Sequence, residues 1–165
     1  MTTIVSASTG KNLELALKLQ SLLQEKDVQV ELVNLVELDL PLYTSEREIL
    51  GMPSSAVSLA EMFSQATDFI FVAPEYNGSL PPVLNNAIAW VSRSGGEDWR
   101  AAFSGKIAAV ATHSGGGNKV LSAMRSQLEH LGVTVLARQI HTHYQKELNP
   151  DSARAVIDQL QALRS

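Results

Sequence analysis

The sequence predicts an α/β three-layer sandwich, in which a five-stranded parallel sheet of strand order 2-1-3-4-5 is covered by helices on both faces. Apolar strand-like runs alternate with amphipathic helix-like runs from one end of the chain to the other. The run at residues 68–73 shows no polar alternation, which is typical of a strand that is buried on both faces of a parallel sheet. With five such runs, this order is the simplest arrangement that keeps the crossovers right-handed.

The expected strands cover residues 2–6, 28–35, 68–73, 106–112 and 133–137, and a long connection covers residues 36–53. The expected helices cover residues 11–25, 55–65, 82–90 and 118–131, and a last helix opens at Asn149 and Pro150 as N-cap and first-turn proline. Apolar residues at helical spacing are expected to face the sheet: Leu15, Leu19, Leu22, Leu23, Val120, Met124, Leu128, Leu131, Ala153, Val156, Ile157, Leu160 and Leu163.

Composition limits the possible functions. The 165 residues suit one domain spanning 1–165, and 45% hydrophobic with 18% charged residues is an ordinary globular balance. The chain has no cysteine, so thiolate nucleophiles and cysteine-bound metals are excluded, and redox chemistry would need a cofactor. A net charge of -4 disfavours nucleic acid as a partner. No basic segment with a long apolar run opens the chain, so we expect no membrane anchor and a cytoplasmic location.

The first loop, residues 6–12, is rich in hydroxyl groups and leads directly from a strand into a helix. Free amides at a helix start attract anions, and several side chains here can donate hydrogen bonds to phosphate oxygens. The alternative is a helix cap without a ligand, since serine and threonine favour such positions. The spacing is neither G-x-G-x-x-G nor a Walker motif, which argues against a Rossmann domain and nucleotide hydrolysis. The sequence therefore predicts a site for a phosphate monoester at Ser6, Ser8, Thr9, Gly10, Lys11 and Asn12.

The hexapeptide loop, residues 74–79, follows the buried strand at 68–73. Asn77-Gly78 predicts a sharp turn, whose amides can point outward toward a planar ring rich in acceptors, as in a flavin. A plain strand-to-helix connection is the alternative reading of the same dipeptide. The candidate ring contacts are Pro74, Glu75, Tyr76, Asn77, Gly78 and Ser79.

The glycine-rich loop, residues 112–118, follows the fourth strand, and its consecutive glycines let the backbone approach a flat ligand. The candidate contacts are His113, Ser114, Gly115 and Gly116. His113 is a candidate for a hydrogen bond to the ring or, secondarily, for a proton shuttle; the alternative is a histidine that only packs. His141 and His143 alternate in an extended segment without an evident third ligand, so we predict no metal site.

These three loops together resemble the NAD(P)H-dependent FMN reductase family, a flavodoxin-like group that includes quinone, azo-dye and chromate reductases. The most specific residues are those of the hexapeptide loop together with Pro82, Leu84, Asn86, Ala87, Ile88 and Trp90, and with residues 39–43 upstream. The resemblance implies that Glu75 to Ser79 contact the isoalloxazine ring, that the first loop holds the FMN phosphate, and that His113 to Gly116 contact the far side of the ring. The first loop lacks the family's usual arginine.

The resemblance implies an FMN-dependent oxidoreductase that takes hydride from NADH or NADPH and passes electrons to a small acceptor such as a quinone, free flavin, azo dye or metal oxyanion. The flavin itself reacts, so no catalytic side chain is expected beyond His113. A flavodoxin-type electron carrier and a cofactor-free binding module on the same fold remain as alternatives.

The helix at 82–90 is apolar around more than half of its circumference, with Val83, Leu84, Ala87, Ile88, Trp90 and Val91. Apolar surface beyond what the sheet can cover is usually buried against a partner, so we expect a homodimer or homotetramer. In such an assembly the site is shared between subunits, and Arg93 and Trp99 line the path by which the nicotinamide reaches it. The alternative is that residues 36–53 fold over this helix within one chain.

Overall fold

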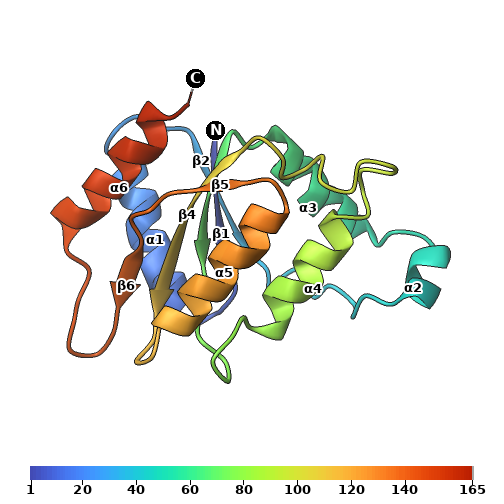
Figure 1. The fold of residues 1–165 in the computed structure, drawn as a ribbon, viewed down its shortest axis with the longest axis horizontal. Helices are drawn as coiled ribbons and strands as arrows, with labels where there is room; N and C mark the ends of the chain where they lie inside the picture. The colour runs from blue at the N-terminus through green and yellow to red at the C-terminus, as the bar shows by residue number, and fades with distance from the viewer. Residues whose placement is uncertain (165) are drawn as a thin grey trace.

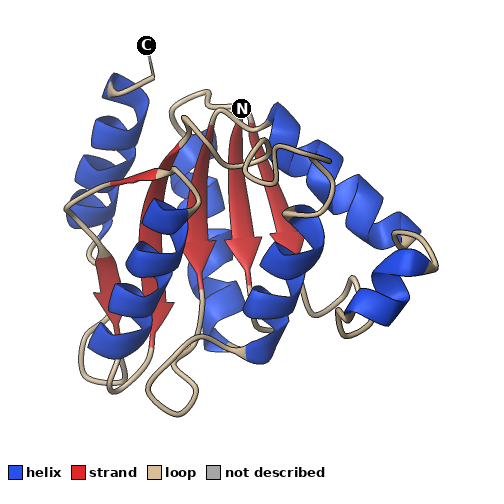
Figure 2. Ribbon diagram, turned by 45° about the vertical axis from the view of Figure 1, so that its right-hand side comes forward, coloured by secondary structure: helices blue, strands red, loops and turns tan. Residues whose placement is uncertain are grey.

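A parallel β-sheet forms the centre of the protein in a computed structural model that describes residues 1–164 (Figure 2). The strand order is β2-β1-β3-β4-β5, which confirms the predicted order 2-1-3-4-5. In register, Ile4 of β1 lies between Leu32 of β2 and Ile70 of β3, and Ile70 lies beside Ala109 of β4. The strand bounds are β1 Thr2–Ser6, β2 Val30–Asn34, β3 Asp68–Val72, β4 Ile107–His113, β5 Thr134–Val135 and β6 Ile140–Thr142.

Helices cover both faces of this sheet, as predicted. One face is covered by α1 (Lys11–Gln24) and α6 (Pro150–Ala162), and the other by α3 (Ser54–Gln65), α4 (Pro82–Val91) and α5 (Asn118–His130). The short helix α2 (Ser45–Ile49) lies apart from the sheet beyond α4 (Figure 1). No helix within residues 1–164 is both long enough and apolar enough to cross a bilayer.

The apolar residues predicted to face the sheet are buried, with one exception. The predicted residues on α1 and α5, and Leu131 just beyond α5, all have exposures of 7% or less: Leu15, Leu19, Leu22, Leu23, Val120, Met124, Leu128 and Leu131. On α6, Asn149 caps the helix by accepting a hydrogen bond from the Ser152 amide at 3.0 Å, as predicted. Leu163, however, is 47% exposed, because α6 ends at Ala162 before the helix can turn this side chain inward.

The fifth position of the sheet differs from the prediction of one strand at residues 133–137. In the described chain, β5 and β6 share this edge, and both pair with β4. From Ala108 to Ala111 β4 advances three residues, while the edge advances five, from Val135 to Ile140, so two extra residues bulge out of the ladder. Arg125 of α5 holds this bulge by donating to the Ala137 carbonyl at 3.0 Å and to the Gln139 side chain.

The excess apolar surface of α4 is covered within the chain, so the alternative reading of residues 36–53 was correct. Trp90 is fully buried, and its indole nitrogen donates to the Pro41 carbonyl at 2.7 Å. The Tyr43 ring packs edge-on against Trp90 at 5.2 Å, and the Tyr43 amide donates to Asn86 Oδ1. The dimer argument drawn from α4 was therefore wrong, because this helix has no uncovered apolar face to offer to a partner.

Candidate functional site

The loops that the sequence singled out lie together at one edge of the sheet. β1, β3 and β4 are parallel neighbours, so their carboxyl ends meet at the same edge, where the arrowheads end in Figure 2. The first loop, the hexapeptide loop and the glycine-rich loop each begin there. In open α/β sheets this edge is the usual place for ligands.

The first loop presents backbone donors at the start of α1. The amide of Gly10 donates to Ser8 Oγ at 3.1 Å, which folds the loop back on itself, and no side chain caps the helix. Within residues 1–164, the amides of Ser8, Thr9, Lys11 and Asn12 have no hydrogen-bond acceptor. Unpaired amides at a helix start form a site for an anion such as a phosphate group.

The hexapeptide loop is a tight hairpin. Tyr76 and Ser79 exchange both of their backbone hydrogen bonds, at 3.1 and 3.0 Å. Asn77 and Gly78 between them have φ values of 51° and 74°, which is the signature of a type I′ turn. The Asn-Gly dipeptide thus forms the sharp turn that was predicted, and its two central amides have no acceptor within residues 1–164.

A cleft of about 330 Å³ lies between the first loop and the hexapeptide loop. Its polar side is formed by Ser8 and Thr9, and its flat side by the half-exposed Tyr76 ring. The cleft thus combines hydroxyl and amide donors for an anion with an aromatic surface for a planar group. Its lining residues are Ala7, Ser8, Thr9, Val36, Tyr76, Pro81, Pro82 and Val83.

The hexapeptide loop is fastened to the glycine-rich loop through Glu75. Glu75 Oε2 accepts a hydrogen bond from the Val120 amide at 3.3 Å, so the carboxylate serves as the missing N-terminal cap of α5. A β-carbon at Gly116 would lie only 2.6 Å from Glu75 Oε1. A side chain at position 116 would therefore displace this carboxylate from its place at the helix, which differs from the predicted approach of these glycines to a flat ligand.

A protein-family model described as NADPH-dependent FMN reductase matches residues 2–147. The chain belongs to this family. A relative named NAD(P)H-dependent FMN reductase, from Pseudomonas aeruginosa, is 34% identical over 119 residues, which are 72% of this chain and 60% of the relative. A quinone reductase of Escherichia coli is 45% identical over 56 residues, which are 33% of this chain and 30% of that enzyme. The chain thus matches less than two thirds of the length of each of these relatives.

Solved structures share the fold over nearly the whole chain. The flavoenzyme NAD(P)H:(acceptor) oxidoreductase FerB from Paracoccus denitrificans superimposes with a TM-score of 0.73 at 24% identity, covering 98% of this chain and 91% of that one. An archaeal flavodoxin superimposes with a TM-score of 0.69 at 14% identity, covering all of both chains. At these identities the likeness concerns the fold, and it confirms the flavodoxin-like prediction.

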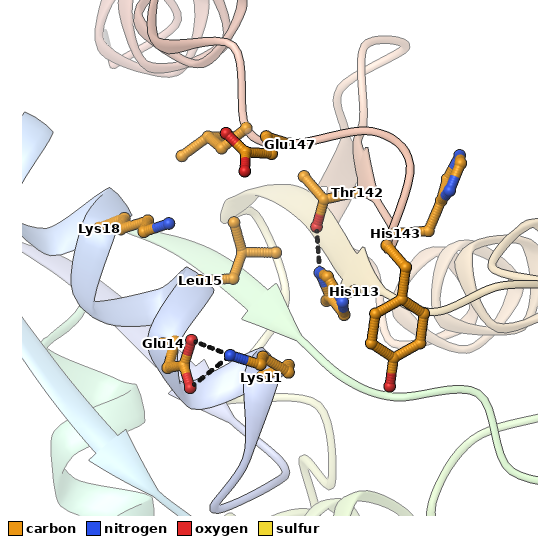
Figure 3. Close-up of a pocket in the computed structure, with 10 residues that line it drawn as sticks. Lys11, Glu14, Leu15, Lys18, His113, Thr142, His143 and Glu147 are labelled. Atoms are coloured by element: carbon orange, nitrogen blue, oxygen red, sulfur yellow. Dashed lines mark hydrogen bonds and ion pairs between the residues drawn. The ribbon is translucent and has the colours of Figure 1, made fainter.

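In this FMN reductase family member, His113 does not face the cleft. As the last residue of β4, it points to the α1 side of the sheet and lines a second cavity of about 220 Å³ with Lys11, Glu14 and Leu15 (Figure 3). Its Nδ1 lies 3.0 Å from Thr142 Oγ1, whose hydroxyl donates to the Thr112 carbonyl, so Nδ1 carries the proton. Burial, and next the charge of Lys11, lowers the pKa of His113. This placement, with Nδ1 held by Thr142, favours the alternative reading, in which His113 packs rather than contacts the ring.

The remaining candidates in the glycine-rich loop divide between structural and open positions. The Ser114 amide donates to the Thr142 carbonyl, and the Ser114 carbonyl accepts from His141 Nε2 at 2.9 Å. These bonds fix the loop to β6. Gly115 is exposed, with open space where a β-carbon would stand. Gly115 thus remains available to a ligand, whereas Gly116 lies against the Glu75 carboxylate.

Two candidates of the first loop are turned inward. Ser6 is fully buried, and its hydroxyl donates to the Ser8 carbonyl at 3.1 Å. Asn12 is 3% exposed, and its side chain accepts from the His113 amide at 2.7 Å and donates to the His113 carbonyl at 3.0 Å. Both side chains hold the loop against the sheet, and Asn12 ties it to the glycine-rich loop. Ser8, Thr9 and Gly10 are left as the accessible part.

Lys11 lies at the start of α1 but is engaged elsewhere. Its ammonium group contacts both carboxylate oxygens of Glu14, at 2.9 and 3.0 Å, on the side of the second cavity (Figure 3). This hydrogen-bonded carboxylate raises the pKa of Lys11. Both side chains are more than half exposed, so the pair can open toward an anion at little cost.

Arg93 and Trp99 lie outside the cleft of their own chain. Arg93 stacks over the Tyr43 ring at 5.5 Å, and Trp99 stacks against His130 at 5.6 Å. His130 is the last residue of α5, whereas the cleft lies near the first residues of that helix. Within one chain, Trp99 is therefore at the wrong end of α5 to line the approach to the site.

Sequence reasoning missed Lys119, which lies beside the hexapeptide loop. A β-carbon at Gly78 would stand 3.2 Å from Lys119 Cδ and 3.6 Å from Nζ. One feature of the sequence could have pointed to Lys119. A lysine in the first turn of a helix is disfavoured by the helix dipole, so its presence there suggests a function. α5 has no acidic residue in its own first turn.

Proposed function

We propose that this protein is an FMN-dependent oxidoreductase that accepts hydride from NADPH or NADH and passes electrons to a small acceptor such as a quinone, with residues 1–165 acting as one domain. The cleft between the first loop and the hexapeptide loop carries the proposal, because it joins unpaired helix amides to a glycine-containing hairpin beside an aromatic ring. Membership of the NADPH-dependent FMN reductase family supports it.

The residues present fit FMN at both of its ends. The amides of Ser8, Thr9 and Lys11, with the hydroxyl groups of Ser8 and Thr9, suit a phosphate monoester, which needs several donors at once. The hairpin at Asn77 and Gly78 suits the edge of a flavin ring, because its unpaired amides meet acceptors. The absence of the family's usual arginine from the first loop makes these amides the main source of phosphate affinity.

When bound, FMN supplies the hydride chemistry, and the side chains serve to bind and orient. Tyr76 and the hexapeptide turn would hold one face and edge of the ring, and Glu75 would hold the turn itself in place. Gly115 would leave room for backbone contact from the neighbouring loop. Binding the two reactants in succession on one ring face requires exposure of that face, and Tyr76 and Asn77 are both exposed.

Titration of the purified protein with FMN, followed by flavin fluorescence and the visible spectrum, tests the binding step. The proposal expects saturable one-to-one binding, anaerobic bleaching by NADPH or NADH, and recovery of the colour on addition of a quinone. A colourless protein with no FMN affinity would overturn the proposal and leave the cofactor-free binding module. Bound FMN that NAD(P)H does not bleach would instead leave the flavodoxin-type electron carrier, whose fold the chain shares.

We further propose that the chain forms a homodimer or homotetramer through the segment around α2. Its support is a set of apolar side chains on this outlying helix, because Ile49 and Leu50 are 85% and 86% exposed and Leu42 is 69% exposed. Such a patch on a monomer is a liability that a partner removes. Light scattering tests the proposal, with Leu50→Glu expected to give monomers and a monomeric wild type contradicting it. A cytoplasmic location belongs to the same proposal, since NADPH and NADH are its electron donors; cell fractionation tests it.

A further inference from the structure

We propose that Lys119 supplies the positive charge that stabilises bound FMN once it has accepted a hydride. This inference rests on the proposed function, since it concerns the same ligand. A hydride brings two electrons and one proton, so a neutral ring that accepts it without a second proton gains one negative charge. A protein that favours this form has to place a positive group or free donors near the ring.

Lys119 lies where such a charge is needed. Its side chain lies beside Gly78 of the hexapeptide loop, the loop proposed to hold the ring, because a β-carbon at Gly78 would stand 3.2 Å from Lys119 Cδ and 3.6 Å from Nζ. The residue is exposed, and it takes part in none of the ion pairs found within residues 1–164. Its ammonium group is therefore free to meet an anion at the hairpin.

The charge of Lys119 is also placed against its own helix. It sits in the first turn of α5, where the positive end of the helix dipole disfavours a cation. The carboxylate of Glu75 caps the helix through the Val120 amide, and no salt bridge joins it to Lys119 in the described chain. The Glu75 carboxylate thus counters the dipole of α5. Lys119 makes no ion pair that would stabilise the described chain.

Other candidates for this charge lie elsewhere. His113 is turned to the far side of the sheet, and the Lys11 ammonium group lies on the side of the second cavity, where it pairs with Glu14. Three of the first four amides of α5 are also in use, since Asn118 N donates to Gly116 O at 2.7 Å, Val120 N to Glu75 Oε2 at 3.3 Å and Leu121 N to Gly117 O at 3.1 Å. Of the groups around the glycine-rich loop, Lys119 is the cation left for a ligand.

Lys119→Gln tests the inference, because it removes the charge and keeps most of the side-chain length. We expect the affinity for oxidised FMN to stay within about twofold, and the affinity for reduced FMN to fall about tenfold. For a two-electron couple, a tenfold change corresponds to about 30 mV, so the midpoint potential of the bound flavin should fall by that amount. Dye equilibration under anaerobic conditions measures it. Lys119→Arg, which keeps the charge, should leave the potential near that of the wild type.

Lys18→Gln is the matched control, because Lys18 is exposed on α1, at the far side of the sheet, and also takes part in no ion pair within residues 1–164. Its removal subtracts the same net charge and should leave the potential unchanged. An unchanged potential in Lys119→Gln, or an equal fall in the Lys18 control, would overturn the inference. If the wild type does not bind FMN, the proposed function itself is wrong. An unchanged potential in a variant that binds FMN contradicts only the role of Lys119, so the two failures are distinguishable.

The FMN-free protein gives a second readout. If Lys119 opposes the helix dipole, Lys119→Gln should raise the Tm of the apoprotein while lowering the flavin potential of the loaded protein. A fall of the Tm would contradict the premise that the charge is kept at a cost to stability.

Discussion

The carboxylate of Glu75 accepts a hydrogen bond from the Val120 amide at 3.3 Å, and this bond joins the loop after β3 to the helix after β4. α5 has Gly117 at its N-cap position and no capping side chain of its own. The cap therefore comes from a residue 45 positions earlier in the chain. This contact makes the geometry of the hexapeptide loop dependent on the start of α5.

Replacing Glu75 should thus weaken both the helix and the loop. Loss of a helix cap costs roughly 0.5 to 2 kcal/mol, so we expect Glu75→Ala to lower the free energy of unfolding by about 1 kcal/mol and to weaken FMN binding. Glu75→Gln keeps an acceptor oxygen and should lose less stability. Urea denaturation and FMN titration measure the two effects. Glu61→Ala, at an exposed position on α3, is the control and should change neither.

Gly78 should not tolerate a branched side chain. Its φ of 74° is a left-handed conformation that costs a non-glycine residue roughly 1 to 2 kcal/mol, and a β-carbon would press on Lys119 at 3.2 Å. We expect Gly78→Val to abolish FMN binding, as the turn has to change shape. Gly96→Val is the control, because Gly96 has a φ of 59° and open space around its β-position. If the Gly78 variant keeps FMN with normal stability, this loop does not hold the ring.

Ser8 and Thr9 should contribute affinity for the phosphate. A hydrogen bond to a charged group is worth roughly 1.5 to 3 kcal/mol, so the double variant Ser8→Ala, Thr9→Ala should weaken FMN by about 2 kcal/mol or more. Its far-ultraviolet circular dichroism should match that of the wild type, because Ser6 and Asn12 still hold the loop to the sheet. Ser58→Ala on the exposed face of α3 is the control. Equal FMN affinity in the double variant and the control would remove the phosphate site from this loop.

The order of the sheet and the position of the site could be predicted from the sequence because both depend on local patterns. Buried strands contain unbroken apolar runs, such as residues 69–72 of β3, and parallel strands bring their following loops to one edge. The Asn77-Gly78 turn was likewise predictable, since few dipeptides accept positive φ at both positions.

What the sequence did not reveal depends on contacts between distant segments. Successive side chains of β4 point to opposite faces of the sheet, and this alternation places His113, the last residue of the strand, on the α1 side. The prediction treated His113 as part of the following loop. The cover over Trp90 comes from Pro41 and Tyr43, which lie in an irregular segment without a periodic pattern. Glu75 of the hexapeptide loop binds the start of α5, and Lys119 of α5 lies beside the hairpin. Both contacts join segments that are distant in the sequence, so spacing along the chain does not predict them.

His113 should make folding stability sensitive to acid. Its pKa in the folded protein is lowered from the usual 6.5, first by burial and then by Lys11, with His143 and Lys18 acting in the same direction and Glu14 opposing them. On acidification, the unfolded chain therefore binds a proton at this histidine before the folded protein does. The free energy of unfolding should fall as the pH drops through 6.5, and this contribution should level off below the folded pKa.

His113→Asn isolates this effect, since its amide nitrogen can still reach Thr142 Oγ1 and it does not titrate. The wild type should lose more stability than this variant between pH 7 and pH 5, measured by denaturant unfolding at each pH. Parallel curves for the two proteins would show that His113 is protonated equally in the folded and unfolded states.

Arg164 and Asp68 form an ion pair at the opposite edge of the sheet from the site. Asp68 begins β3 and is fully buried, and it accepts from Arg164 Nε and from the Thr67 hydroxyl at 2.9 Å. Arg164 also donates to Thr2 Oγ1 of β1, so it closes the N-terminal ends of two strands. Removing one partner of a buried pair leaves an uncompensated charge, which costs roughly 3 to 5 kcal/mol. Because Arg164 is itself 26% exposed, we expect Arg164→Ala to lower the free energy of unfolding by about 3 kcal/mol.

The double variant Asp68→Asn, Arg164→Ala should recover part of this loss, since the buried carboxylate is then gone as well. Arg154→Ala is the control, because its pairs with Glu25 and Asp151 are largely exposed and such pairs contribute at most about 1 kcal/mol. FMN binding should be unaffected in all three variants, because Asp68 and the cleft lie at opposite ends of β3. If Arg164→Ala is as stable as Arg154→Ala, water reaches the Asp68 carboxylate and the pair is not a buried one.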